Sequence, residues 1–274
     1  MILTPDIIQG LGLNDSVRLV EKFNNGRGLS DVYKLLCTQG AFVAKKARDN
    51  VVSPISEVEF GIALMTNGFY DFAQSLRVYY DTNFGGFWTL YPLIYGIPLD
   101  ARSIGNVVAE LGAVLSSFHA ASSVVAKSFL SSPVRALIDA DANEIIRARG
   151  GELCIIHGDL RDDNIIIEDS SRLILIDFEF RSLGYPALDI ASLRITMLNR
   201  DGYSVMSDEA FSDIIDAYST RAKDETLRKL CESADFDIVI ASYYDTISLQ
   251  IAEKDLALAD VCVAISKFFR KRRH

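Results

Sequence analysis

Hydrophobic residues follow two different rhythms along the chain. Up to about residue 96, short β-branched and aromatic runs are separated by turn signals, among them NNGRG at 24–28 and TQG at 38–40. These runs predict strands over 17–23, 32–37, 41–45, 76–80 and 87–94. We therefore expect a sheet of about five strands, near the usual size, whose first three strands form an antiparallel meander.

One helix interrupts the predicted strands, and helices take over after residue 96. Ser53 is a capping residue, Pro54 suits the first helical position, and Asn67-Gly68 is a stop signal. From residue 104 to residue 118, apolar residues recur at steps of three and one, which is typical of an amphipathic helix. Helical patterns also dominate from about residue 189 to the basic run at 267–273. The second part is therefore predicted to be mainly helical.

Composition narrows the class of protein. The chain has 274 residues, of which 49% are hydrophobic and 24% charged, and this excludes disorder as its main state. We find no run of about 18 uncharged apolar residues and no signal peptide, so we expect a soluble cytoplasmic protein without a membrane partner. The 4 cysteines are far apart and there are 3 histidines, so neither a disulfide framework nor a zinc site is predicted.

The net charge of −9 is unevenly distributed. Residues 1–98 hold 8 Lys/Arg against 9 Asp/Glu, a balance of −1, whereas residues 99–274 hold 20 against 28, a balance of −8. An acidic surface argues against nucleic acid as a partner. The acidity of the second part serves solubility, or it concentrates a cationic substrate.

One compact β island is predicted inside the helical part, with a strand at 153–156 and a hairpin of strands 165–167 and 173–176. It carries polar residues that a packed hairpin does not need: HGDLRDDN at 157–164, and Asp177 on the next strand. A loop entering the hairpin can bring Asp159, Asn164 and Asp177 to one end of it. There Asn164 and Asp177 offer oxygen ligands suited to Mg²⁺, and Asp159 can accept a hydroxyl proton. Read singly, each residue is also a usual turn former.

These strings resemble a known family. H-G-D-L-x-x-x-N followed by I-D-F-E is similar to the aminoglycoside phosphotransferase and choline kinase family, whose members are relatives of the protein kinases. The resemblance implies an α+β, bilobal, protein-kinase-like fold. Its small antiparallel N-terminal lobe, residues 1–95, would carry one helix and bind the nucleotide. Its larger, mainly helical C-terminal lobe, residues 96–274, would carry the catalytic hairpin and the substrate site.

The same resemblance implies the nucleotide contacts, in an order and spacing that agree with the family. The residues it implies are Gly28 and Ser30 in the loop over the nucleotide, Lys45 in the string FVAK, Glu57 as its ion-pair partner, and Tyr91, Pro92 and Ile94 in the hinge strand. Taken alone, the sequence at 26–30 is also typical of a hairpin turn. Adjacent strand residues face opposite sides, so the match selects Lys45 over Lys46. Glu59 competes with Glu57 for the pairing.

Departures from the family pattern concern the catalytic loop. Arg161 stands where related enzymes place lysine or histidine, and it either steadies the transferring phosphoryl group or pairs with Asp162 or Asp163. In the GYPALD string at 184–189, tyrosine replaces an aspartate, which leaves Asp189 to support the loop. His119 and His157 are expected to be hydrogen-bonded core histidines. Glu179 is expected in solvent at a strand end rather than near the metal.

The function predicted from this resemblance is an ATP- and Mg²⁺-dependent kinase acting on a hydroxyl of a small molecule: an aminoglycoside, an amino alcohol such as choline, or a sugar. A protein kinase is disfavoured, because the 6 residues between Asp177 and Gly184 are too few for an activation segment. A catalytically silent nucleotide-binding module is the alternative from another class. The preference for ATP over GTP and the oligomeric state are left open by the sequence.

Overall fold

The chain divides into two compact units. A computed structural model describes residues 3–13, 17–23, 31–46, 54–83, 85–100, 103–127, 139–169, 171–253 and 255–272. Unit 1 comprises Met1–Thr66 and Phe72–Tyr95, and unit 2 comprises Asn67–Asp71 and Gly96–His274. The short segment Asn67–Asp71, which the expected boundary assigned to the first lobe, packs within unit 2. Its Phe69 ring lies 5.5 Å from the Phe118 ring, and the Asp71 carbonyl accepts the Leu175 N–H at 3.0 Å.

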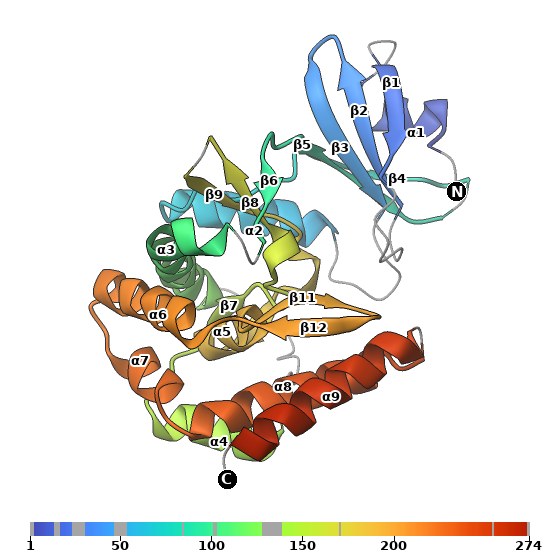
Figure 1. The fold of residues 1–274 in the computed structure, drawn as a ribbon. Coiled ribbons are helices and arrows are strands. Elements are labelled where there is room, and N and C mark those ends of the chain that lie inside the picture. Colours follow the sequence, from blue (N-terminus) through green and yellow to red (C-terminus); the bar gives the residue numbers. More distant parts are fainter. Residues whose placement is uncertain are drawn as a thin grey trace. The chain divides into compact units, whose positions relative to one another are not determined.

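Unit 1 is built on a five-stranded antiparallel sheet with the order β1-β2-β3-β5-β4 (Figure 1). Its strands are β1 (Val17–Lys22), β2 (Val32–Cys37), β3 (Gly40–Lys46), β4 (Arg77–Tyr80) and β5 (Phe87–Pro92). The predicted strand number and the meander of the first three strands are confirmed. The later pair does not continue the meander, because β5 inserts between β3 and β4.

A short helix that the sequence analysis did not predict covers one face of this sheet. Helix α1 (Pro5–Gly10) and the turn after it place Ile7 and Leu11 in the unit's hydrophobic core. The sheet supplies Leu35, Ala44 and Trp88 to the same core, and these residues share one face by the strand register. The predicted helix α2 (Pro54–Thr66) brings Glu57 to Tyr91, whose register position lies on the opposite face.

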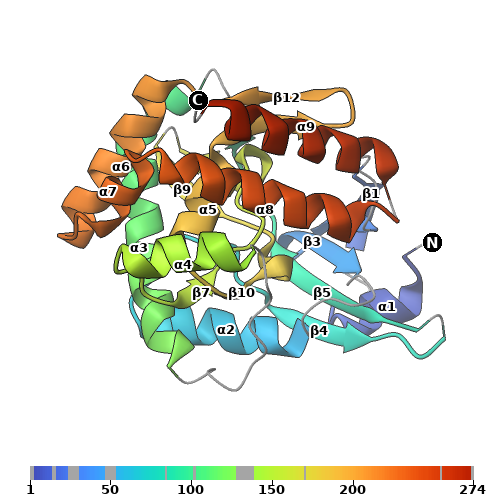
Figure 2. The ribbon, with the colours of Figure 1, turned by 90° about the horizontal axis from the view of Figure 1, so that it is seen from below.

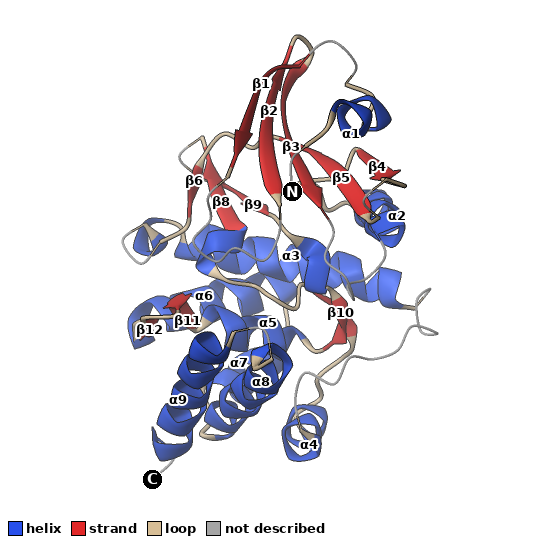
Figure 3. Ribbon diagram, turned by 90° about the vertical axis from the view of Figure 1, so that its right-hand side faces the viewer, coloured by secondary structure: helices blue, strands red, loops and turns tan. Residues whose placement is uncertain are grey.

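Unit 2 is mainly helical (Figure 3). Its helices are α3 (Val108–Ala126), α4 (Ala140–Ala148), α5 (Pro186–Leu193), α6 (Asp208–Ala222), α7 (Thr226–Cys231), α8 (Asp235–Ile251) and α9 (Leu256–Arg272). Helices α8 and α9 run side by side (Figure 2). A 3₁₀ turn at Ile104–Asn106 precedes α3, so the predicted helix from residue 104 is divided.

Helix α3 is the central helix of unit 2. It packs against α6 and the strand β7 (Cys154–Ile156). The contact with α6 is close, because a Cβ added at Gly112 would lie 2.4 Å from the carbonyl oxygen of Ile214. Among the described helices, α3 is long and apolar enough to cross a membrane by length and composition, and 50% of that apolar window is buried within unit 2. This burial is the arrangement of a core helix.

The predicted β island divides into two separate sheets, which corrects the single island expected from the sequence. Strand β7 pairs with β10 (Ser182–Gly184), while the hairpin of β8 (Ile165–Glu168) and β9 (Arg172–Leu175) pairs with β6 (Ile97–Pro98). The polar residues at 157–164 therefore connect two sheets rather than two neighbouring strands. A further hairpin, β11 (Ile195–Asn199) with β12 (Gly202–Val205), lies in the region that was predicted to be mainly helical.

Candidate active site

Asp189 holds the backbone of the loop that joins β7 to β8. Its carboxylate accepts the N–H of His157 at 2.8 Å and the N–H of Gly158 at 3.0 Å. Asp189 is 1% exposed and lies on α5, so the contact ties this helix to the loop. Gly158 has φ +78°, and a Cβ there would lie 2.2 Å from the Phe180 carbonyl oxygen. Glycine is required at this bend, and Asp189 lies where the sequence analysis expected it.

Two buried histidines support the same loop. The Nε2 of His119 lies 3.0 Å from Asp189 Oδ2, and its Nδ1 lies 3.1 Å from the Tyr218 hydroxyl. The Nε2 of His157 lies 2.8 Å from the carbonyl oxygen of Ile176, which can only accept a hydrogen bond. Both rings use their nitrogens within the protein, so the prediction of hydrogen-bonded core histidines is confirmed.

Asp159 is a partly exposed carboxylate of the loop, with 26% of its side chain accessible. Its two oxygens lie 2.9 Å and 3.1 Å from the guanidinium of Arg161. The side-chain amide of Asn164 donates to the Asp159 carbonyl at 2.7 Å and to its carboxylate at 3.3 Å. Burial raises the pKa of Asp159, Arg161 opposes that shift, and the negative charge of Asp177 adds to it. The result is a positioned carboxylate with increased affinity for a proton.

Arg161 pairs mainly with Asp159, a contact that the sequence analysis did not consider. It also lies 3.6 Å from Asp163, one of the two carboxylates proposed from the sequence, whereas Asp162 instead accepts the N–H of Asp163. Arg161 itself has extended backbone angles, φ −127° and ψ 167°. Because alternate residues of an extended segment point to the same side, the spacing of Asp159 and Arg161 could have indicated their pairing.

Asn164 and Asp177 supply the oxygen atoms of the candidate metal site. Asn164 directs its NH₂ group to Asp159, which leaves its amide oxygen as the group that can meet a cation. Asp177 follows β9 in a left-handed conformation, φ 64° and ψ 59°, and its charge acts on Asp159. A carboxylate beside a second carboxylate is relieved by a cation, so these donors fit Mg²⁺. No group of three or more His, Cys, Asp or Glu ligands occurs in the described ranges.

Glu179 is placed differently from its sequence-based expectation. It lies in a 3₁₀ turn, Phe178–Phe180, and is 6% exposed, so it is neither at a strand end nor in solvent. The preceding residue, Phe178, is also buried, and its ring lies 4.6 Å from the His157 ring. The string DFEF therefore turns back into the core directly after Asp177 instead of continuing β9.

In unit 1, the register of the sheet places Lys45 on the face that carries Tyr91. Lys45 pairs with Thr89 and Val43 with Tyr91, and residues two apart on a strand share a face. The Tyr91 hydroxyl donates to Glu57 at 2.6 Å, so Glu57 approaches this face, whereas Glu59 is exposed. Lys46 belongs to the opposite face. These positions agree with the choice of Lys45 and Glu57, while their pairing with each other stays a prediction.

The end of β5 has the features expected of a hinge strand. Leu93 donates its N–H to the Ala41 carbonyl at 3.0 Å, which makes Phe42 and Pro92 a non-hydrogen-bonded pair. Proline costs no ladder bond at this position. The N–H of Ile94 makes no hydrogen bond within the described part of the chain, so it can serve as a donor. The roles of Tyr91, Pro92 and Ile94 toward a nucleotide stay predictions. Gly28 and Ser30 lie outside the described residues.

A sequence comparison supports the phosphotransferase prediction. Residues 130–230 match the family described as the phosphotransferase enzyme family. This segment contains Asp159, Arg161, Asn164, Asp177 and Asp189. A comparison with curated proteins finds no match.

Solved structures show the fold over nearly the whole chain. The choline kinase LicA from Streptococcus pneumoniae matches with a TM-score of 0.65 and 17% identity, over 98% of this chain and 97% of that one. A choline/ethanolamine kinase family protein from Mesorhizobium loti matches with 0.64 and 13%, over 98% and 95%. An aminoglycoside 2′-phosphotransferase-IIIa matches with 0.60 and 15%, over 98% and 97%.

Three predictions from the sequence are thereby confirmed: the resemblance to this family, the α+β protein-kinase-like fold and the phosphotransferase class. Residues 130–230 match the model of the phosphotransferase enzyme family, and nearly the whole chain is similar in fold to choline and aminoglycoside kinases.

Proposed function

We propose that this phosphotransferase transfers the γ-phosphate of Mg·ATP to a hydroxyl group of a small molecule. The observation that carries the proposal is the cluster around Asp159. Asn164 and Arg161 hold its carboxylate in place, and the charge of Asp177 acts on it. A positioned base beside two oxygen donors is what phosphoryl transfer requires, because catalysis there consists of positioning and charge stabilisation.

In the proposed reaction, Asp159 accepts the proton of the substrate hydroxyl. The hydroxyl oxygen forms a bond to the γ-phosphorus, the bond from that phosphorus to the β–γ bridging oxygen breaks, and ADP leaves with the electron pair. Asn164 and Asp177 would hold Mg²⁺, which neutralises charge on the phosphates when it is bound. Arg161 fixes the orientation of the Asp159 carboxylate through two contacts, at 2.9 Å and 3.1 Å.

Unit 1 supplies the proposed nucleotide contacts. Lys45 would meet the phosphates, with Glu57 as its partner, and the Ile94 N–H together with the Pro92 carbonyl would meet the edge of the base. Among the structures with this fold, LicA is described in complex with AMP and the aminoglycoside 2′-phosphotransferase in complex with GDP. Titrating ATP and GTP separately, in the presence of Mg²⁺, decides which nucleotide this chain prefers.

The acceptor is proposed to be a small amine that carries a hydroxyl group, either an aminoglycoside or an amino alcohol such as choline or ethanolamine. Residues 99–274 carry a charge balance of −8, which favours cations. The similar structures include choline and ethanolamine kinases and an aminoglycoside kinase described in complex with kanamycin. A neutral sugar lacks the charge that an acidic surface attracts.

One experiment tests the reaction and the acceptor together. ADP release is measured with Mg·ATP and a panel of kanamycin, choline, ethanolamine and neutral sugars, with Asp159→Asn as the matched inactive variant. We expect turnover of one of the amines, lost in the variant. Selective turnover of a sugar contradicts the cationic acceptor, and turnover that persists in Asp159→Asn contradicts the base.

A catalytically silent nucleotide-binding module is the alternative function. It predicts that ATP binds, as seen by calorimetry, while ADP is not released with any member of the panel. The presence of Lys45, Asp159 and Asp177 argues against it, because silent relatives usually lack the lysine, the base or a metal ligand.

A further inference from the structure

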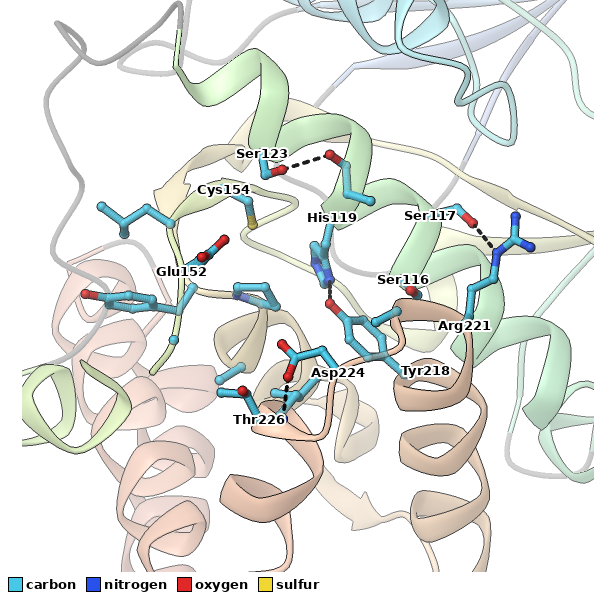
Figure 4. Close-up of a pocket in the computed structure, with 18 of the residues that line it drawn as sticks. Ser116, Ser117, His119, Ser123, Glu152, Cys154, Tyr218, Arg221, Asp224 and Thr226 are labelled. Atoms are coloured by element: carbon cyan, nitrogen blue, oxygen red, sulfur yellow. Dashed lines mark hydrogen bonds between the residues drawn. The ribbon is translucent and has the colours of Figure 1, made fainter. Parts of the chain in front are cut away.

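Unit 2 contains a pocket that includes His119 and Tyr218 but none of the polar side chains of the loop at 157–164. Its volume is about 610 Å³, within the range of small-molecule sites. Its walls come from α3, α6, α7, the start of α5 and the connection from α4 to β7 (Figure 4). Asp159, Arg161, Asn164 and Asp177 are not among the residues that line it. The pocket therefore needs an explanation separate from phosphoryl transfer.

The lining carries no net charge. Two arginines, Arg149 and Arg221, oppose two carboxylates, Glu152 and Asp224. Arg149 is already held by Asp235 at 2.6 Å, a residue outside the lining. The thiol of Cys154 is neutral as well, because burial raises its pKa. A pocket whose formal charges cancel gives an ion little net attraction to offset its loss of hydration, so these walls favour an uncharged ligand.

The remaining walls combine apolar surface with hydroxyl groups. Leucine, isoleucine, valine and alanine side chains line much of the pocket, and Ser116, Ser117, Ser123 and Tyr218 add hydroxyls. Tyr218 on α6 and His119 on α3 both line the pocket, and the contact between them is drawn in Figure 4. Burial raises the pKa of Tyr218, so its proton stays on the oxygen.

The hydrogen bonds of His119 and Tyr218 leave a ligand the role of a hydrogen-bond donor. The carboxylate of Asp189 can only accept, so His119 Nε2 donates to it, and in the neutral ring Nδ1 accepts from the Tyr218 hydroxyl. The Tyr218 oxygen has donated its proton and can accept a hydrogen bond from another molecule. A ligand hydroxyl is a suitable donor.

We propose that this pocket binds an uncharged organic molecule with an apolar ring and a hydroxyl group that donates to Tyr218, and that occupancy is transmitted to the catalytic loop. The chain of contacts is short. Tyr218 meets His119 at 3.1 Å, His119 meets Asp189 at 3.0 Å, and Asp189 accepts the N–H groups of His157 and Gly158. The next residue along the chain is Asp159.

A matched set of probes tests the binding. Calorimetry compares 2-naphthalenemethanol with 2-naphthoate and 2-naphthalenemethylamine, which share the ring and differ in charge. We expect the neutral alcohol to bind about tenfold more tightly than either ion. Equal or stronger binding of an ion overturns the uncharged ligand class, and a lack of binding by the alcohol overturns the site.

Two tryptophan variants locate the bound alcohol. Ala120 is an exposed residue of α3 that lines the pocket, and Ala109 is an exposed residue of the same helix that does not. Ala120→Trp is expected to weaken binding at least about tenfold by filling the pocket, and Ala109→Trp is expected to leave it unchanged. Equal affinity in both variants places the probe elsewhere and overturns the site. Both substitutions are at the surface, so both proteins are expected to fold.

Tyr218→Phe tests the hydrogen bond. It keeps the ring and removes the hydroxyl, and we expect the alcohol to bind about fivefold more weakly while the affinity of 2-methylnaphthalene is unchanged. Equal losses for both probes contradict a bond to Tyr218.

Amide hydrogen exchange tests the coupling to the catalytic loop. We expect the bound alcohol to slow exchange at His157 and Gly158, because a restrained His119 steadies Asp189. Unchanged exchange at saturation overturns the coupling. Calorimetry and exchange need no turnover, so these outcomes are independent of the proposed kinase activity.

Discussion

Asp159 lies in the loop that Asp189 supports, but the two carboxylates have opposite environments. Asp189 is 1% exposed, and its oxygens accept two backbone N–H groups and an imidazole. Asp159 is partly accessible, contacts the side chains of Arg161 and Asn164, and has a raised pKa. A carboxylate whose oxygens accept fixed backbone donors positions the chain, whereas one held by side chains near a second charge is available for proton transfer. The comparison separates a supporting aspartate from a reactive one.

The largest expected effect is that of Asp159→Asn on turnover. Removing a general base lowers the rate by about 10²–10⁴-fold, because the amide cannot take the hydroxyl proton. The nucleotide affinity and the free energy of unfolding are expected to change little. ADP release measures the first, and calorimetry with urea unfolding measures the others. Loss of folding together with activity would place Asp159 in the same class as Asp189.

Asp189→Asn is expected to reverse this pattern. The N–H of His157 is accepted by Oδ2 and that of Gly158 by Oδ1, so the NH₂ group that replaces either oxygen faces one of these donors. A buried donor without an acceptor costs about 1–3 kcal/mol. The free energy of unfolding, measured in urea, falls by that amount. A stability equal to that of the unmodified protein would show that the loop does not depend on these bonds.

Asp177→Asn tests whether the second charge near Asp159 belongs to the metal site. Asparagine tolerates the left-handed backbone found at this position, so the fold is expected to persist. Loss of the carboxylate charge is expected to weaken the affinity for Mg·ATP about tenfold, measured by titration at several magnesium concentrations. The matched control is nucleotide binding without magnesium, which should not change. An unchanged Mg·ATP affinity removes Asp177 from the metal site.

Arg161→Ala is expected to change the pH dependence of the rate rather than the fold. Arg161 acts to lower the pKa of Asp159, so without it the pKa rises further. The base must be ionised, and the acid limb of the kcat/KM profile is therefore expected to move to higher pH. Arg161→Lys keeps the charge and should move the limb less, while Arg147→Ala, at an exposed arginine of α4, should leave it in place.

The sequence predicted those parts of the molecule that local patterns determine. The strands of unit 1, helix α2 and the loop at 157–164 follow from alternation, capping and residue chemistry. Helix α1 was missed although its signals are present, since Thr4 accepts the Ile7 N–H and Pro5 stands at the first helical position. Its six residues are too few for a recognisable period.

Long-range pairing was beyond a pattern-based prediction. The local sequence does not indicate that Cys154–Ile156 pairs with Ser182–Gly184 instead of with the nearby hairpin. The β11–β12 hairpin has a turn signal at Asn199, whose side chain accepts the N–H groups of Asp201 and Gly202. Its two strands were missed because the helical pattern of the flanking sequence was taken to include them. The burial of Glu179 likewise depends on a tertiary turn that the strand pattern conceals.

The left-handed backbone of Asp177 lowers the stability of the fold at a position whose carboxylate the proposed activity needs. A side chain in this conformation costs about 1 kcal/mol relative to glycine, which adopts it freely. Asp177→Gly is therefore expected to raise the midpoint of thermal unfolding slightly while it abolishes magnesium-dependent turnover. Selection for heat resistance alone would favour the glycine, so a chain that keeps aspartate at this corner accepts a weaker backbone in exchange for its carboxylate.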